Sequence, residues 1–149
     1  MTEDKLIPKL NWFYNLELNQ VDLYTAQSKA EKDDYISLAF KRIAYIEQQH
    51  IYNIGSLIKK LGYKPPPMAD IITPIIGNIL GKGLSLTGTA SVLKANILIE
   101  QKAMKDYKEL IHSLDRNNDK EIIQILQSNL IDEDLHAAWF ANKLTEIKQ

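Results

Sequence analysis

The sequence predicts an all-α fold, a four-helix bundle in which two antiparallel helix pairs are joined by a long crossover. Apolar residues recur at spacings of three and four in four stretches, which is the period of an amphipathic helix. All 6 Gly and every Pro except Pro8 lie between residues 55 and 88, which leaves the four stretches almost free of helix breakers. A length of 149 residues suits one domain, which we expect to cover residues 1–149.

The first two helices are expected at residues 6–31 and 34–61. They are separated by a turn of only a few residues, which makes them antiparallel neighbours. Gly62 follows the second helix and suits the left-handed conformation that often ends a helix.

The last two helices are expected at residues 90–114 and 122–147, again as antiparallel neighbours. A polar turn separates them at residues 115–118. Asn118, with Glu121 three residues later, predicts a capping box at the start of the last helix.

Residues 62–84 form the predicted crossover. Fully extended, they reach about 75 Å, whereas a helix of the expected length spans about 40 Å. The chain can therefore cross the whole bundle. Thr73 and Pro74 predict a short helix inside this segment, with Thr73 as its cap.

Composition excludes several classes of site. The net charge of -1 lacks the excess of positive charge that is typical of nucleic-acid-binding proteins. The absence of cysteine excludes disulfides, thiolate zinc sites and rubredoxin-type iron. The charged N-terminus lacks an apolar signal core, and no run of about 18 apolar residues occurs, so we expect a cytoplasmic protein.

Ionisable residues interrupt the apolar stripes where leucine would be expected. Glutamate is rarely buried without a partner, and no Lys or Arg lies near these positions on the stripes. Four buried carboxylates therefore require another positive charge, which two divalent cations would supply. The predicted metal ligands are Glu17, Glu47, His50, Glu100, Glu133 and His136.

The spacing of these residues supports a metal site. Residues 47–50 and 133–136 both read Glu-x-x-His, which puts both side chains on one helix face. A single glutamate on each of the other two helices completes the di-metal carboxylate pattern. One such motif is weak evidence, but two copies in the expected helices are strong.

The two halves of the chain also repeat each other. A shift of 83 residues places Glu17 on Glu100, and a shift of 86 places Glu47 on Glu133. A pseudo-twofold arrangement is what two equivalent metal ions require. We expect Glu47 and Glu133 to bridge both ions.

Carboxylate-rich ligation with two imidazoles favours iron, with manganese as the alternative, over zinc. Two iron ions would react with O2 or peroxide, and the electron donor is unknown. Tyr24 and Tyr107 lie two turns after ligand glutamates. We interpret them as core side chains, with hydrogen bonding to a ligand or one-electron chemistry as the alternative.

On these six positions the chain resembles the ferritin-like di-iron superfamily, which includes bacterioferritins, rubrerythrins and demethoxyubiquinone hydroxylases. Glu17 to Gln27, the run 77–88, and Glu100 with Tyr107 are most similar to the hydroxylases. The chain departs from them at Asp106, where they carry histidine. It departs from bacterioferritin at Gln48, where a haem-ligating methionine stands, so no haem is expected.

Three functions follow from the resemblance. The first is a ferroxidase- or peroxidase-type di-iron oxidoreductase, the second a monooxygenase of a quinone-like lipophilic substrate, and the third a non-catalytic iron-binding stress protein. The second function implies peripheral membrane contact through apolar residues of the crossover. We instead favour a role for these residues in covering the bundle end or in a dimer contact. The residues concerned are Ile71, Ile72, Ile75, Ile76, Ile79 and Leu80. We also expect the protein to be a homodimer.

Overall fold

The computed structural model describes residues 1–67 and 88–148. Four α-helices account for most of them, and the described residues contain no strand. The all-α fold class predicted from the sequence is therefore confirmed. The helices are α1 (Glu3–Ala30), α2 (Asp34–Lys60), α4 (Thr89–Ser113) and α5 (Lys120–Glu146).

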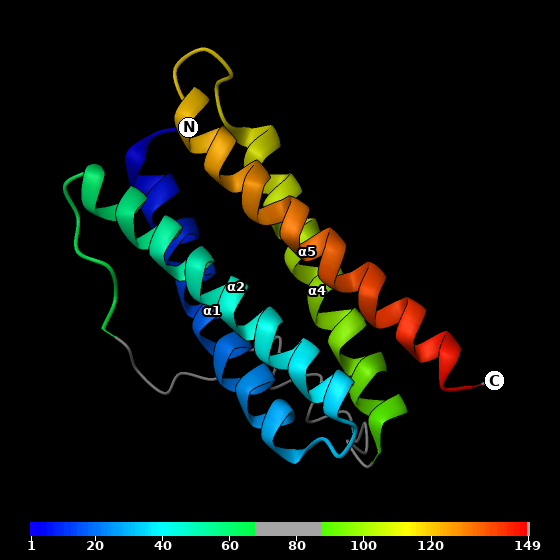
Figure 1. The fold of residues 1–149 in the computed structure, drawn as a ribbon. Coiled ribbons are helices and arrows are strands. Elements are labelled where there is room, and N and C mark those ends of the chain that lie inside the picture. The colour runs from blue at the N-terminus through cyan, green and yellow to red at the C-terminus, as the bar shows by residue number, and fades with distance from the viewer. Residues whose placement is uncertain (68–87, 149) are drawn as a thin grey trace. The chain divides into compact units, whose positions relative to one another are not determined.

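The chain forms two compact units, Met1–Thr73 and Pro74–Gln149. In the first unit α2 runs back along α1, and in the second α5 runs back along α4 (Figure 1). Both predicted antiparallel pairs are present. The helix bounds agree with the sequence-based ranges to within a few residues.

The ends of α2 are set by side-chain and backbone capping. The Asp33 side chain accepts a hydrogen bond from the Ile36 amide at 2.9 Å, which satisfies one of the unpaired amides of the first turn. At the other end Gly62 has φ 85, and the Tyr63 amide donates to the Ile58 carbonyl at 3.1 Å. This is a Schellman-type ending, which confirms the role predicted for Gly62.

The start of α5 differs from the prediction. Asp119, not Asn118, precedes the helix, and its side chain makes no capping hydrogen bond. Instead Asp119 Oδ2 accepts from the Asp115 amide at 2.9 Å, and Asn118 Nδ2 donates to Asp115 Oδ2 at 3.0 Å. The predicted capping box is wrong because the turn uses both side chains for its own hydrogen bonds.

The predicted stripes form the buried face of each helix. Leu10 and Tyr24 on α1, and their repeat partners Leu93 and Tyr107 on α4, are completely buried. Phe40 and Ile54 on α2, with Leu126 and Phe140 on α5, are at most 1% exposed. The internal repeat read from the sequence is therefore also a repeat in burial.

Two sets of predictions fall on undescribed residues. The short helix at Thr73 and Pro74 and the apolar residues between Ile71 and Leu80 lie outside the described residues. Among the helices that the structure describes, none is long and apolar enough to cross a membrane.

Candidate metal centre

The first unit brings three predicted ligands together. Glu17 comes from α1, and Glu47 and His50 come from successive turns of α2. His50 Nδ1 lies 2.9 Å from Glu47 Oε2 and 3.5 Å from Glu17 Oε2. Each residue offers one ligand atom within 4.8 Å of the others, which is close enough for one cation to contact all three.

The second unit repeats this arrangement with Glu100 from α4 and with Glu133 and His136 from α5. His136 Nδ1 lies 3.7 Å from Glu100 Oε2. One ligand atom of each residue again lies within 4.8 Å of the other two. The same ring nitrogen, Nδ1, faces a carboxylate oxygen in both units.

Local folding explains why the ligands converge. Residues three apart on a helix lie on one face, so each Glu-x-x-His motif presents its two side chains together. The antiparallel neighbour then supplies the single glutamate at the same height, Glu17 or Glu100. All six residues predicted from the sequence are placed in these two clusters.

Burial gives the clusters their electrostatic character. The four glutamates are 0% exposed, while His50 and His136 are 1% and 4% exposed. Removing a carboxylate from water is costly unless a positive charge compensates it. A divalent cation in each cluster matches two carboxylates in charge, and imidazole and carboxylate are ordinary ligands of iron and manganese. The residues present therefore fit a metal ion in each unit.

Three further polar side chains are completely buried on the ligand-bearing faces, and the periodicity of the sequence does not predict them. Gln20 lies one turn after Glu17, Asn96 one turn before Glu100, and Asn129 one turn before Glu133. The sequence feature that could have predicted them is a side-chain amide on an apolar stripe, one turn away from a predicted ligand. Such side chains can orient ligands, as hydrogen-bonding neighbours of metal sites do.

The tyrosines that follow the ligand glutamates are both core residues. Tyr24 and Tyr107 are 0% exposed. The Tyr107 hydroxyl accepts a hydrogen bond from Asn129 Nδ2 at 3.1 Å. This contact agrees with the interpretation of Tyr107 as a packed side chain whose hydroxyl is satisfied within the core.

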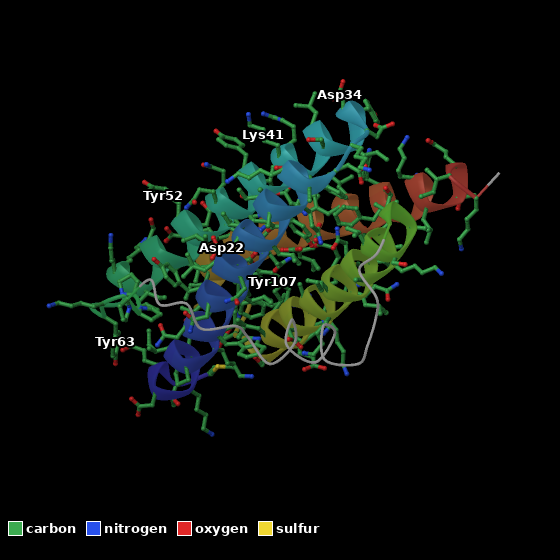
Figure 2. The ribbon with its side chains drawn as sticks, turned by 90° about the horizontal axis from the view of Figure 1, so that it is seen from below. Asp22, Asp34, Lys41, Tyr52, Tyr63 and Tyr107 are labelled. Carbon is green, nitrogen blue, oxygen red and sulfur yellow. The ribbon has the colours of Figure 1, made fainter. Side chains whose placement is uncertain are left out.

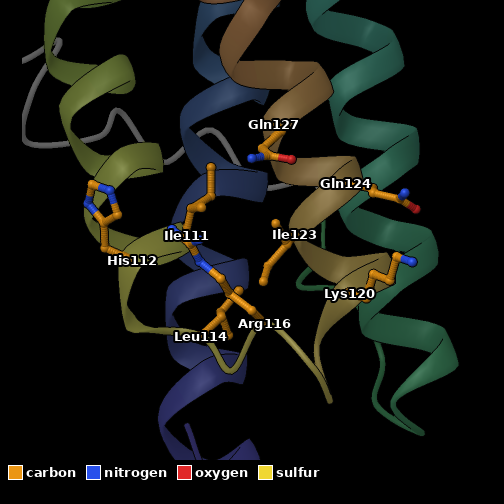
Figure 3. Close-up of a pocket in the computed structure, with 8 residues that line it drawn as sticks. All are labelled: Ile111, His112, Leu114, Arg116, Lys120, Ile123, Gln124 and Gln127. Carbon is orange, nitrogen blue, oxygen red and sulfur yellow. The ribbon is translucent and has the colours of Figure 1, made fainter.

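A pocket lies elsewhere in the second unit, at the turn between α4 and α5 (Figure 3). It encloses about 440 Å³, and none of the described residues that line it carries a carboxylate. Arg116 and Lys120 are among them, beside the apolar side chains of Ile111 and Ile123. A site lined in this way offers no ligand set for a dication.

Comparison with known proteins places the chain in a family. No curated protein matches it. A family model described as Ferritin-like domain matches residues 9–149, which include all six predicted ligands. The match covers nearly the whole sequence, as the resemblance seen in the ligand pattern leads one to expect. The chain therefore belongs to the ferritin-like domain family.

Proposed function

We propose that this protein binds two iron ions and acts as an oxidoreductase that consumes O2 or peroxide. The observation that carries the proposal is the pair of buried clusters, each with two glutamates and one histidine whose ligand atoms lie within 4.8 Å of one another. Membership of the ferritin-like family agrees with it.

The proposed roles follow the two clusters. Glu17, Glu47 and His50 bind one ion, and Glu100, Glu133 and His136 bind the other. Two carboxylates neutralise each dication, so the loaded interior carries no net charge from these groups. Iron is preferred to zinc because the ligand set is rich in carboxylates and contains no thiolate.

When bound, two ferrous ions supply two electrons, which with two protons reduce O2 to hydrogen peroxide or hydrogen peroxide to two water molecules. The chain's own contribution is to position the metal ligands and to enclose them away from water. Leu10 and Ile54 in the first unit, and Leu93 and Phe140 in the second, lie on the ligand-bearing faces and are at most 1% exposed. These side chains keep bulk water from the carboxylates and hold the ligands in one arrangement.

The test is ferrous oxidation under controlled conditions. Anaerobic protein with two equivalents of ferrous iron is mixed with O2 or hydrogen peroxide, and ferric absorbance is followed by stopped flow. We expect oxidation much faster than that of free ferrous iron. Glu47→Gln and Glu133→Gln should slow it by about 100-fold or more, because each removes a ligand charge. Gln48→Ala and Asp134→Asn alter exposed neighbours of these ligands and serve as matched controls.

The outcomes separate the hypotheses. Binding of two ions without accelerated oxidation would contradict the oxidoreductase and favour the non-catalytic iron-binding protein. Equal rates in all four variants would show that the ligands are misassigned. Quinone hydroxylation would need the apolar surface that the resemblance assigns to the segment 71–84, which lies outside the described residues.

A further inference from the structure

The pocket at the turn between α4 and α5 combines an apolar lining with basic side chains (Figure 3). In that lining Ile111 and Ile123 are half-buried and Leu114 is buried, whereas the polar residues are exposed. The polar residues are His112, Arg116, Lys120, Gln124 and Gln127. The volume of about 440 Å³ lies within the range of small-molecule sites, about 300–1,000 Å³, and exceeds what a single ion needs.

The basic residues of the pocket lack a carboxylate partner among the residues that the structure describes. Elsewhere in the same unit Lys102, Lys105 and Lys143 each pair with an acidic side chain three or four residues further along the helix. Arg116 and Lys120 form no such pair with any described residue. A guanidinium and an ammonium group beside apolar surface therefore keep a positive charge that an anionic ligand can neutralise.

The acidic residues of the turn are engaged by the turn itself. Asp115 accepts hydrogen bonds from the Asn117 amide at 2.8 Å and from Asn118 Nδ2 at 3.0 Å. Asp119 Oδ2 accepts one from the Asp115 amide at 2.9 Å. Neither aspartate lines the pocket. The turn thus uses its carboxylates to fix its own backbone, and the charge of Arg116 remains for a ligand.

The corresponding turn of the first unit has a different chemistry. The repeat shifts of 83 and 86 residues place Ser28 and Ser37 at the positions of the two pocket isoleucines. The Ser37 hydroxyl donates to the Ser28 carbonyl, which ties α1 to α2 at this end. Asp34 stands where the second unit has Lys120, and three residues join α1 to α2 where six join α4 to α5. The apolar and basic lining is therefore a property of the second unit, and an antiparallel helix pair does not require it.

We propose that this pocket binds a small phosphomonoester with an apolar body. The Arg116 guanidinium donates paired hydrogen bonds to the phosphate oxygens, and Lys120 supplies a second positive charge. A phosphomonoester carries a charge of about -1.5 to -2 near pH 7, which matches these two cations better than a monocarboxylate does. The apolar body lies against Ile111 and Ile123, where it leaves water. The two glutamine amides and the His112 imidazole offer hydrogen bonds at the rim.

The first test measures the binding of phenyl phosphate to the metal-free chain by isothermal titration calorimetry, so that no iron attracts the anion. We expect a dissociation constant of about 1 mM or lower, as suits a ligand of this size. Benzyl alcohol, which has the ring without the charge, should not bind. Inorganic phosphate should bind at least about 10-fold more weakly, because it leaves the apolar lining unused. The protein loaded with ferrous iron should give the same constant for phenyl phosphate, since no residue of the pocket is a predicted metal ligand.

The second test locates the anion contact. Arg116→Gln should weaken the binding of phenyl phosphate by at least about 10-fold, and Lys120→Gln by about threefold or more. Arg42→Gln is the matched control, because Arg42 is the other arginine of the sequence and is also exposed. It should stay within about twofold of wild type. Circular dichroism verifies that each variant is folded.

The third test removes the apolar lining and keeps the charge. A double variant with Ile111→Ser and Ile123→Ser gives the second unit the side chains that the first unit carries at these positions. Both isoleucines are only half-buried, so the helix pair should still form. Phenyl phosphate should then bind no more tightly than inorganic phosphate, while the affinity for inorganic phosphate should stay within about twofold of wild type.

Four results would each overturn the proposal. The first is no binding of phenyl phosphate up to about 10 mM, and the second is binding only when iron is present. The third is an equal loss in Arg116→Gln and Arg42→Gln, which would indicate attraction by net charge alone. The fourth is equal affinity of the wild-type chain for phenyl phosphate and inorganic phosphate. None of these outcomes decides the proposed iron chemistry, because the predicted metal ligands lie outside the pocket.

Discussion

The two units hold the same ligand types at the same spacing, but they support them differently. In the α1–α2 unit, His50 Nδ1 lies within 3.5 Å of carboxylate oxygens on both helices. In the α4–α5 unit, His136 Nδ1 lies 3.7 Å from Glu100. The second unit carries two buried asparagines near its ligands, whereas the first carries one buried glutamine. Repetition thus preserved the ligands while their surroundings diverged, which predicts two metal sites of unequal strength.

The largest expected effect is loss of metal on removal of a histidine. His50→Ala and His136→Ala should each reduce tight binding from about two ferrous ions per chain to about one, with affinity at the altered site falling by more than about 100-fold. Because His50 Nδ1 lies 3.5 Å from the single glutamate of its unit and His136 Nδ1 lies 3.7 Å from that of the other, the ion that survives in His136→Ala should bind more tightly. Anaerobic isothermal titration calorimetry measures both values. Equal affinities of the surviving ions would remove the predicted difference between the units.

Metal loading should stabilise the fold substantially. A ligand at 100 times its dissociation constant adds about 2.7 kcal/mol, which corresponds to a rise in Tm of about 5–10 °C for a chain of this size. Glu100→Gln should raise the Tm of metal-free protein, because it removes a buried charge, and should shrink the rise on loading. Anaerobic calorimetry with ferrous iron tests both. A metal-free Tm that falls in Glu100→Gln would contradict the electrostatic argument.

The next effect tests the hydrogen bond from Asn129 to Tyr107, whose donor has no counterpart at the repeat position of the first unit. Asn129→Leu removes the donor to Tyr107 and should lower the free energy of unfolding by about 1–3 kcal/mol. The repeat position in α2 is Ile43, which is buried and apolar, so the same shape is already tolerated there. Urea unfolding of Asn129→Leu, Tyr107→Phe and the double variant gives the coupling between them. Simple additivity would show that the hydrogen bond contributes nothing.

The helix starts should also differ between the units. Asp33→Ala removes the cap on Ile36 and should cost about 1 kcal/mol. Asp119→Ala should cost less, because Asp119 does not cap α5 and loses only an exposed turn contact with the Asp115 amide. Urea unfolding compares them, and a larger cost for Asp119→Ala would reverse the assignment.

How much of the fold and of the candidate site can be predicted depends on what each sequence pattern reports. Periodicity identifies the buried face of a helix, so the four helices and the burial of Glu17, Glu100 and their partners followed from the sequence. It does not report which side chains hydrogen-bond within that face, which is why Asn129 and Gln20 went unnoticed. The start of α5 was mispredicted because competing contacts of Asp115 decide the turn.

The smallest expected effect is the pH response of that turn. Hydrogen bonds from the amides of Asn117 and Asn118 hold the pKa of Asp115 below its usual value. Because the folded pKa is the lower one, the ionised side chain stabilises the turn above about pH 4, and this contribution is lost as pH falls through the folded pKa. Asp115→Asn should therefore flatten the acid limb of a stability–pH curve slightly. An unchanged acid limb would contradict this assignment.

The most direct measurement is a crystal structure of ferrous-loaded protein with anomalous data at the iron edge. Two iron peaks per chain are expected. One should lie about 2.0–2.3 Å from atoms of Glu17, Glu47 and His50, and the other at the same distances from Glu100, Glu133 and His136. Iron bound elsewhere, or no iron peak between those six side chains in the ferrous-loaded crystal, would contradict the account.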